Sequence, residues 1–293
     1  MKDEARIRYP RSKFGRAILT AVAWIVVGAF MVPFVWMVAS SLLPTSQIGT
    51  SGRAAPLLLG QSGVGLSGIV TLSNYVRLLG SSFPPALARS MIVAAAVVVG
   101  GLSVATLAGF ALSVLRFPHR DAIFAVVVVS FVVPTDATAF AMLRLARGWG
   151  LENSYLGLIV PVMVDGIVIF LLRQFFLGIP RELVEAARVD GASWLAVLTR
   201  IFVPIARPAL IGGGLVLFVN QWAAYLWPLL IVSQPNMALA PIALAQAYTG
   251  DLHSVDYGVM FAGSVVLTLV PVVVLLPLQR YFTQSLSTSG IAG

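Results

Sequence analysis

The chain has 293 residues, of which 59% are hydrophobic and only 10% are charged, and its mean hydropathy is +0.95. A soluble domain averages about 45–50% apolar and about 25% charged residues, so this composition excludes a soluble globular protein and predicts an all-α, multi-pass membrane protein. The absence of cysteine excludes disulfides and thiolate metal sites. The two histidines, His119 and His253, fall in predicted loops on opposite sides, so we expect no metal site.

A basic cluster opens the chain. Residues 1–16 are predicted to form a basic N-terminal segment, whose charges are Lys2, Arg6, Arg8, Arg11, Lys13 and Arg16. Such clusters hold a segment on the cytoplasmic side of a membrane, so the net charge of +8 indicates membrane orientation rather than a nucleic-acid partner. The apolar run Ala17–Ala39 is longer than a signal-peptide h-region of about 7–15 residues, and we interpret it as an uncleaved span.

Six stretches are long enough to cross the bilayer as helices of about 20 mostly apolar residues. They are Ala17–Ser40, Ser90–Leu115, Ala122–Leu143, Tyr155–Phe176, Pro208–Ile231 and Tyr257–Leu278. We therefore predict one membrane domain over residues 17–288 and a small-residue tail over residues 289–293. An even number of spans places both termini on one side. Most of the 19 Lys and Arg residues fall on that side, which predicts cytoplasmic N and C termini.

The longest predicted extracytoplasmic segment covers residues 41–88. Residues 49–68 are rich in Gly, Ser and Pro, and Leu72–Leu79 has the pattern of a short amphipathic helix. Within the second predicted span, Gly101, Ala105 and Gly109 form a small-xxx-small face, which predicts close packing against another helix.

A charged, helix-forming segment, residues 177–208, interrupts the apolar pattern. Pro180 suits the first turn of a helix, and the acidic residues Glu182 and Glu185 follow it, where they favour the helix dipole. The spacing predicts that Leu183, Ala186 and Ala187 share one face. Asp190-Gly191 predicts a sharp turn, followed by a second helical run from Ala192 to about Ile201. Pro204 and Pro208 then mark the return to the bilayer.

This segment resembles the cytoplasmic EAA loop of permease subunits of ATP-binding-cassette importers. The matching residues are Glu185, Ala186, Ala187, Asp190, Gly191, Ala192, Ile201, Pro204 and Pro208. The resemblance implies a coupling helix that seats in a cleft of a separate ATPase subunit. The residues implied to contact or shape it are Glu182, Glu185, Ala186, Ala187, Asp190, Gly191, Ala192 and Pro204. The alternative is an ordinary amphipathic loop between two spans.

The resemblance extends over most of the chain from Ser90 onward, including Gly150–Pro161, Phe170–Phe176, Trp222–Leu229 and Gln279–Phe282. The most similar subgroup is the second, maltose-type permease of carbohydrate importers, which implies a type I importer permease fold in a bacterial or archaeal cell membrane. It also implies a second permease, an ATPase dimer and an extracytoplasmic solute-binding protein as partners. Ala223 and Ala224 stand where that subgroup has polar residues, so the role of those polar groups is not carried over. Glycerol-phosphate and oligosaccharide cargo both remain open.

Polar side chains inside the predicted spans indicate a candidate translocation path. Charges in a bilayer are costly and usually face a partner or a water-filled path. The candidates are Asp136, Asp165, Asn220, Gln221, Trp222 and Tyr225, which combine hydrogen-bonding groups with the aromatic faces that a sugar site needs. The alternative for Asp165 and Asn220 is a hydrogen bond between helices, and for Trp222 and Trp227 the favoured interpretation is packing.

The sequence contains no G-x-x-x-x-G-K-[ST] loop and no nucleophile–base constellation. We therefore expect no catalytic residue and no bound cofactor in this chain, with ATP and Mg²⁺ held by the partner ATPase. An ion-coupled secondary transporter is the alternative function, but it predicts inverted repeats that the sequence does not show. An intramembrane enzyme would need paired catalytic groups, for which Asp136 and Asp165 alone do not suffice.

Overall fold

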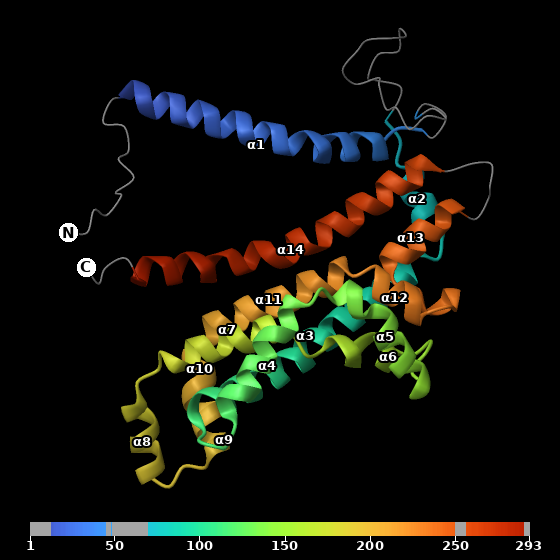
Figure 1. Ribbon diagram of the computed structural model, residues 1–293. Coiled ribbons are helices and arrows are strands. Elements are labelled where there is room, and N and C mark those ends of the chain that lie inside the picture. Colours follow the sequence, from blue (N-terminus) through green and yellow to red (C-terminus); the bar gives the residue numbers. More distant parts are fainter. Residues whose placement is uncertain (1–12, 45–47, 49–69, 250–255, 290–293) are drawn as a thin grey trace. The chain divides into compact units, whose positions relative to one another are not determined.

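The computed structural model describes residues 13–44, 48, 70–249 and 256–289, and every regular element in these ranges is a helix (Figure 1). Contacts divide the chain into two units. Unit 1 contains residues 1–80 and 253–266, and unit 2 contains residues 81–252 and 267–293. Most of the predicted basic N-terminus, the Gly-rich stretch 49–68, His253 and the tail beyond Ser289 lie outside the described residues.

Three helices are individually long and apolar enough to cross a membrane, namely α1 (Lys13–Ser41), α3 (Phe83–Val114) and α14 (Tyr257–Ser289). Three bent helix pairs raise the number of candidate spans to as many as 6. The all-α membrane fold is therefore confirmed, whereas several predicted spans are broken helices. The second span also begins at Phe83 instead of the predicted Ser90, because Pro84 and Pro85 occupy the first helical positions, where a missing N–H costs nothing.

The predicted third span, Ala122–Leu143, is wrong as a single helix. α4 (Arg120–Val132) and α5 (Thr135–Gly148) meet at an angle of 106°. Val133 is extended, with φ −77° and ψ 120°, since Pro134 disfavours helical geometry in the residue before it. Asp136 consequently lies in the first turn of α5, outside the apolar helix in which it was predicted.

The predicted fourth span, Tyr155–Phe176, is also interrupted. α6 (Tyr155–Ile159) continues into the 3₁₀ turn η3 (Val160–Val162), and α7 (Gly166–Leu177) follows after a bend of 47°. Asp165 caps α7, and its Oδ1 accepts hydrogen bonds from the backbone N–H groups of Ile167 (2.8 Å) and Val168 (3.1 Å). Asp165 therefore occupies a helix start and not the middle of a continuous helix.

The predicted fifth span, Pro208–Ile231, divides into α11 (Arg207–Ala223) and α12 (Leu226–Ile231). Ala224 is extended, and the short 3₁₀ turn η5 (Pro235–Met237) and α13 (Ala240–Thr249) follow α12. Asn153, at the start of α6, accepts hydrogen bonds from the backbone N–H groups of Ser233 (2.8 Å) and Gln234 (3.0 Å). These bonds hold the segment after α12 against the start of α6.

Small residues let α3 pack closely against its neighbours in unit 2, as predicted. A Cβ added to Gly109 would lie 3.2 Å from both the backbone N of Arg173 and the Cβ of Leu172 on α7. A Cβ at Gly101 would lie 2.9 Å from Leu217 of α11. Ala105, between them, is 1% exposed. The three helices α3, α7 and α11 therefore pack around one buried apolar cluster of unit 2.

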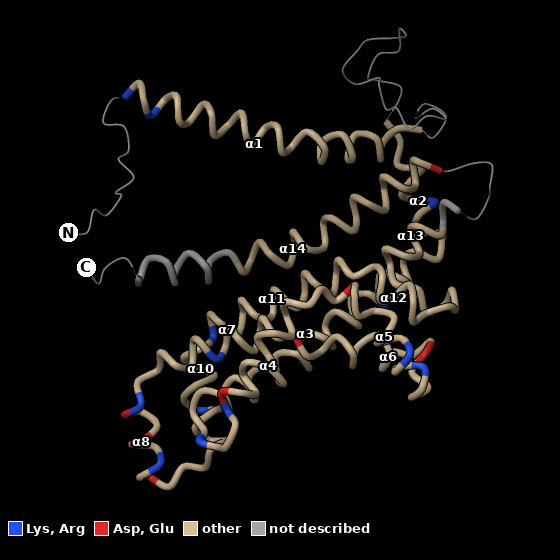
Figure 2. The backbone as a smooth tube through the Cα atoms, in the orientation of Figure 1, with Lys and Arg blue, Asp and Glu red and all other residues tan. Residues whose placement is uncertain are grey.

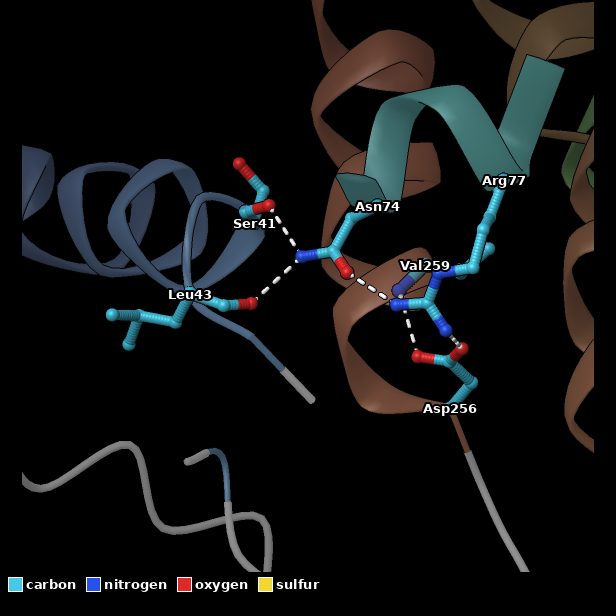
Figure 3. Close-up of polar contacts among 6 residues, drawn as sticks. All are labelled: Ser41, Leu43, Asn74, Arg77, Asp256 and Val259. Carbon is cyan, nitrogen blue, oxygen red and sulfur yellow. Dashed lines mark hydrogen bonds and ion pairs between the residues drawn. The ribbon is translucent and has the colours of Figure 1, made fainter. Parts of the chain in front are cut away.

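A buried polar cluster joins three segments of unit 1 (Figure 3). Asn74 of α2 (Ser73–Leu79) is 0% exposed, and its amide donates to the carbonyl oxygens of Ser41 and Leu43 at 2.8 Å each. Its Oδ1 accepts from Arg77 at 2.6 Å, and Arg77 forms an ion pair with Asp256. The predicted amphipathic helix is confirmed, and it connects the end of α1 to the start of α14.

Candidate coupling site

The charged loop forms a helical hairpin at one end of unit 2 (Figure 1). α8 (Arg181–Val189) begins directly after Pro180, whose φ of −54° precedes the first turn, and Glu182 lies in that turn. Figure 2 shows charged residues gathered along α8, around the start of α4 and near the end of α5, while α3 and α11 are mostly uncharged. The loop is therefore a polar, helical element attached to apolar helices.

The two faces of α8 differ in what they contact. Val184 and Ala187 are half-buried against the apolar core of unit 2. Glu182, Glu185 and Ala186 are exposed, and Val189 is 87% exposed. Within the described part of the chain, no salt bridge involves Glu182 or Glu185. The outer face of α8 therefore presents carboxylates beside exposed apolar groups.

The face shared by Leu183, Ala186 and Ala187 lies largely away from the core, since Leu183 is 43% exposed and Ala186 is also exposed. Val184 and Ala187, three residues apart on the same side of the helix, face the core instead.

α8 ends in a Schellman motif at Gly191. Gly191 has φ +79°, its N–H donates to the carbonyl of Arg188 (3.1 Å), and the Ala192 N–H donates to the carbonyl of Ala187 (2.9 Å). Asp190 is the exposed residue before the bend. The predicted glycine turn is confirmed, and its cause is a left-handed conformation that glycine adopts without steric cost.

The Arg188 side chain also stabilises the bend at Gly191. Its guanidinium donates to the carbonyl of Ala192 at 2.6 Å and lies 4.5 Å from the ring centroid of Trp194. Ser193 caps the next helix by accepting from the backbone N–H of Ala196 at 3.2 Å. The direction in which the chain leaves α8 is therefore determined by side-chain contacts as well as by backbone geometry. Sequence reasoning missed Arg188, although a basic residue in the last turn of a helix is a recognised C-terminal signal.

The second arm of the hairpin anchors the loop to the core. It consists of α9 (Trp194–Val197), a π-helical turn (Leu198–Phe202) and α10 (Val203–Ile205). Phe202 is 1% exposed, and its ring meets those of Phe110 and Phe176 edge-on at 5.0 and 5.3 Å between centroids. Pro204 lies at the first turn of α10 and is exposed. A displacement of this arm would therefore be transmitted to α3 and α7 through buried aromatic rings.

The structure brings together only some of the predicted translocation-path residues. Asn220 donates to Asp165 Oδ2 at 3.4 Å, which joins α11 to the start of α7. Gln221, the next residue, is 7% exposed. Trp222 donates from Nε1 to the carbonyl of Leu267 at 3.1 Å and stacks on Phe218.

Tyr225 is 45% exposed at the start of α12, and Asp136 is exposed at the start of α5. Trp227 is 7% exposed and donates to the carbonyl of Gly157 at 3.2 Å, which agrees with its predicted packing role. A role in solute passage stays a prediction for all six path residues.

Comparison with known proteins identifies the family. Residues 101–288 match the model of the binding-protein-dependent transport system inner membrane component. The arabinooligosaccharides transport system permease protein AraQ of Halalkalibacterium halodurans is 29% identical over 262 residues, which cover 89% of this chain and 91% of that protein. The sn-glycerol-3-phosphate transport system permease protein UgpE of Salmonella typhi is 32% identical over 201 residues, covering 69% and 72% of the two chains.

A solved structure of similar fold supports the same assignment. A chain of a bacterial ABC transporter involved in the import of the acidic polysaccharide alginate superposes with a TM-score of 0.76 at 22% sequence identity, covering 94% of this chain and 100% of that chain. The family model that spans residues 101–288, together with the relative of 32% identity, shows that the chain belongs to the family of binding-protein-dependent transport system inner membrane components.

Proposed function

We propose that this chain is the second permease of an ABC importer for a sugar or sugar-like solute. A separate ATPase subunit binds α8 and drives the transport. The observation that carries the ATPase contact is the outer face of α8, where Glu182, Glu185 and Val189 are exposed on a helix whose other face is fastened to the core. A partner that moves this face moves the helical body behind it. The chain itself supplies no hydrolytic chemistry in this proposal.

In the proposed mechanism, closure of the ATPase dimer displaces α8, and the displacement reaches α3 and α7 through Phe202 and its ring contacts with Phe110 and Phe176. The broken helices then change between inward-open and outward-open arrangements, which is a two-state equilibrium biased by nucleotide. N and C termini on the ATPase side follow from the charge distribution along the sequence.

The names of the relatives support a carbohydrate cargo, since one transports arabinooligosaccharides and the structural neighbour takes part in alginate import. The relative named for sn-glycerol-3-phosphate supports a second candidate, a small phosphorylated polyol. We favour the sugar because the relative that matches the larger share of this chain is named for oligosaccharides, and the structural neighbour is named for a polysaccharide.

Purification of the tagged chain from its native membrane tests the assembly. The proposal predicts co-purification of a Walker-A-bearing ATPase and a second permease. Recovery of this chain alone, with ion-gradient-driven uptake, would instead support a secondary transporter. For the cargo, thermal-shift screening of the associated binding protein against arabinose oligosaccharides, alginate oligosaccharides and sn-glycerol-3-phosphate should give a positive shift with a saccharide. A shift with glycerol phosphate alone would contradict the sugar assignment without affecting the ATPase proposal.

A further inference from the structure

Two adjoining hollows lie beside the inner face of α8. The smaller, of about 250 Å³, lies between the end of α3, the end of α7, α8 and α9. The larger, of about 450 Å³, lies at the loop between α3 and α4. Arg116, Arg120 and Arg181 line both. The two hollows therefore form one basic pocket, defined by these arginines, that separates α8 from the α3–α4 loop.

The positive charge of the basic pocket is only partly neutralised. Arg116 and Arg181 form no salt bridge among the described residues. Asp121 is the carboxylate nearest to Arg120, with 3.4 Å between Asp121 Oδ1 and Arg120 Nε, and it also lies 3.9 Å from a guanidinium nitrogen of Arg173. Arg188 and Glu185, which lies at the boundary between the inner and outer faces of α8, line the smaller hollow as well and balance each other in charge. Arginines therefore outnumber carboxylates around this pocket.

The smaller hollow also has an apolar lining. Leu177 and Trp194, which are 47% and 40% exposed, contribute to it together with the half-buried Val114 and Val184. Val114 is the last residue of α3, a helix apolar enough to span a membrane, so the basic pocket lies where such a helix reaches the membrane surface. The first turn of α4, at Arg120, adds the positive end of a helix dipole. Arginines beside exposed apolar side chains, close to the membrane surface, can bind a ligand that has an anionic headgroup and an apolar body.

We propose that the basic pocket binds the phosphate of an anionic phospholipid such as phosphatidylglycerol, between Arg116, Arg120 and Arg181. Basic pockets between helices at the charged side of a membrane are recognised sites for lipid headgroups. A free phosphate offers the same head chemistry but leaves the exposed apolar side chains of Leu177 and Trp194 uncovered. A bound headgroup would bridge α8 to the α3–α4 loop, so the lipid would hold the inner face of the coupling helix while its outer face stays open.

The test uses the intact transporter in detergent, titrated with phosphatidylglycerol, with phosphatidylcholine or with inorganic phosphate, and bound molecules are counted by native mass spectrometry. We expect phosphatidylglycerol to be retained in preference to phosphatidylcholine. The double variant Arg116→Gln/Arg120→Gln should weaken its retention about 25-fold, at about fivefold for each arginine at a membrane surface. Arg116→Lys/Arg120→Lys, which keeps both charges, should keep most of it.

Arg144→Gln is the matched control, because it removes one exposed arginine from α5 and should leave lipid retention unchanged. Equal retention of the two lipids would overturn the proposal. Saturation by inorganic phosphate with no preference between lipids would assign the pocket to a free anion instead. Dissociation of the ATPase from the double variant with lipid retention intact would assign the arginines to the ATPase contact. Each outcome is read separately from uptake, so failure of the lipid proposal leaves the transport proposal untouched.

Discussion

The bend at Gly191 offers the sharpest perturbation of the coupling site, because the effect of a substitution there comes from the backbone alone. Gly191 has φ +79°, and a Cβ added to it would meet nothing within 4 Å. A left-handed conformation costs an ordinary L-residue about 1–2 kcal/mol. We therefore expect Gly191→Val to destabilise the hairpin by about 2 kcal/mol, and Gly191→Ala by about 1 kcal/mol.

Asparagine and proline set the two ends of this series. Asn tolerates the left-handed region, so Gly191→Asn should destabilise the hairpin by only about 0.3 kcal/mol. Gly191→Pro fixes φ near −65° and removes the hydrogen bond from the Gly191 N–H to Arg188, and should be the most damaging, at about 3 kcal/mol or more. Gly191→Asp keeps the backbone tolerance of Asn but adds a negative charge beside Asp190 at the proposed ATPase contact. A difference between Asn and Asp would therefore report on the contact surface rather than on the bend.

The assay is the amount of ATPase subunit that co-purifies with the tagged chain, together with ATP-driven uptake. If the hairpin must be formed for binding, 2 kcal/mol weakens apparent ATPase affinity by up to about 30-fold, depending on how stable the wild-type hairpin is. Gly150 supplies a matched control, because it has φ +67°, open space around its Cβ and the same pair of Schellman hydrogen bonds at the end of α5. Gly150→Val carries equal strain and should leave ATPase association intact. Wild-type association and uptake in Gly191→Val would refute the reasoning, and so would equal losses in both variants.

Three further substitutions test the helical body and the path. Asp165→Ala should reduce uptake at unchanged expression. Asp165→Ser keeps a side chain that can cap the helix but removes the charge. Normal uptake by the Ser variant would indicate a capping role, which is worth about 1 kcal/mol, and continued loss would support a role in the translocation path. Gly109→Ala should overpack α3 on α7, which costs about 1–3 kcal/mol of stability and lowers the melting temperature of the purified complex. At Gly148 an added Cβ meets no atom within 4 Å, so Gly148→Ala should leave the melting temperature unchanged. Equal melting temperatures for the two variants would contradict the close packing of α3 on α7. Gly258→Ala would place a Cβ 2.5 Å from Oδ1 of the buried Asn74 and should destabilise unit 1. Gly80→Ala, the control, makes only ordinary contacts at 3.6 Å. A Gly258→Ala complex of unchanged stability would show that the polar cluster around Asn74 can rearrange.

Local signals in the sequence predicted the coupling hairpin well. Asp190-Gly191 determines the bend through the backbone freedom of one residue, and Pro180 marks the helix start, so neither depends on distant contacts. Which side of α8 faces inward was not predictable in the same way. The choice between Leu183 and Val184 depends on the helices behind α8, whose position no local pattern encodes.

The hydropathy pattern did not indicate where the predicted third and fourth spans are interrupted. The apolar run continues through Val133-Pro134, and only the steric effect of proline on the preceding residue predicts that the helix ends there. Asp165 precedes an apolar helical run and has the signature of a helix cap, but its apolar surroundings favoured a mid-span position. The burial of Asn74 depends on carbonyl groups more than thirty residues away in sequence, at Ser41 and Leu43, and no local signal could indicate it.

The central claim is that the outer face of α8 contacts the ATPase, and the absence of native cysteine allows a direct measurement. A benzophenone maleimide attached at Val189→Cys, which replaces an 87% exposed residue of α8, is photo-activated in the assembled transporter. Arg144→Cys, exposed on α5, is the control position. The account predicts a cross-link to the ATPase subunit from position 189 and none from position 144. No cross-link from position 189 in an assembled, ATP-hydrolysing complex, or equal cross-linking from both positions, would contradict it.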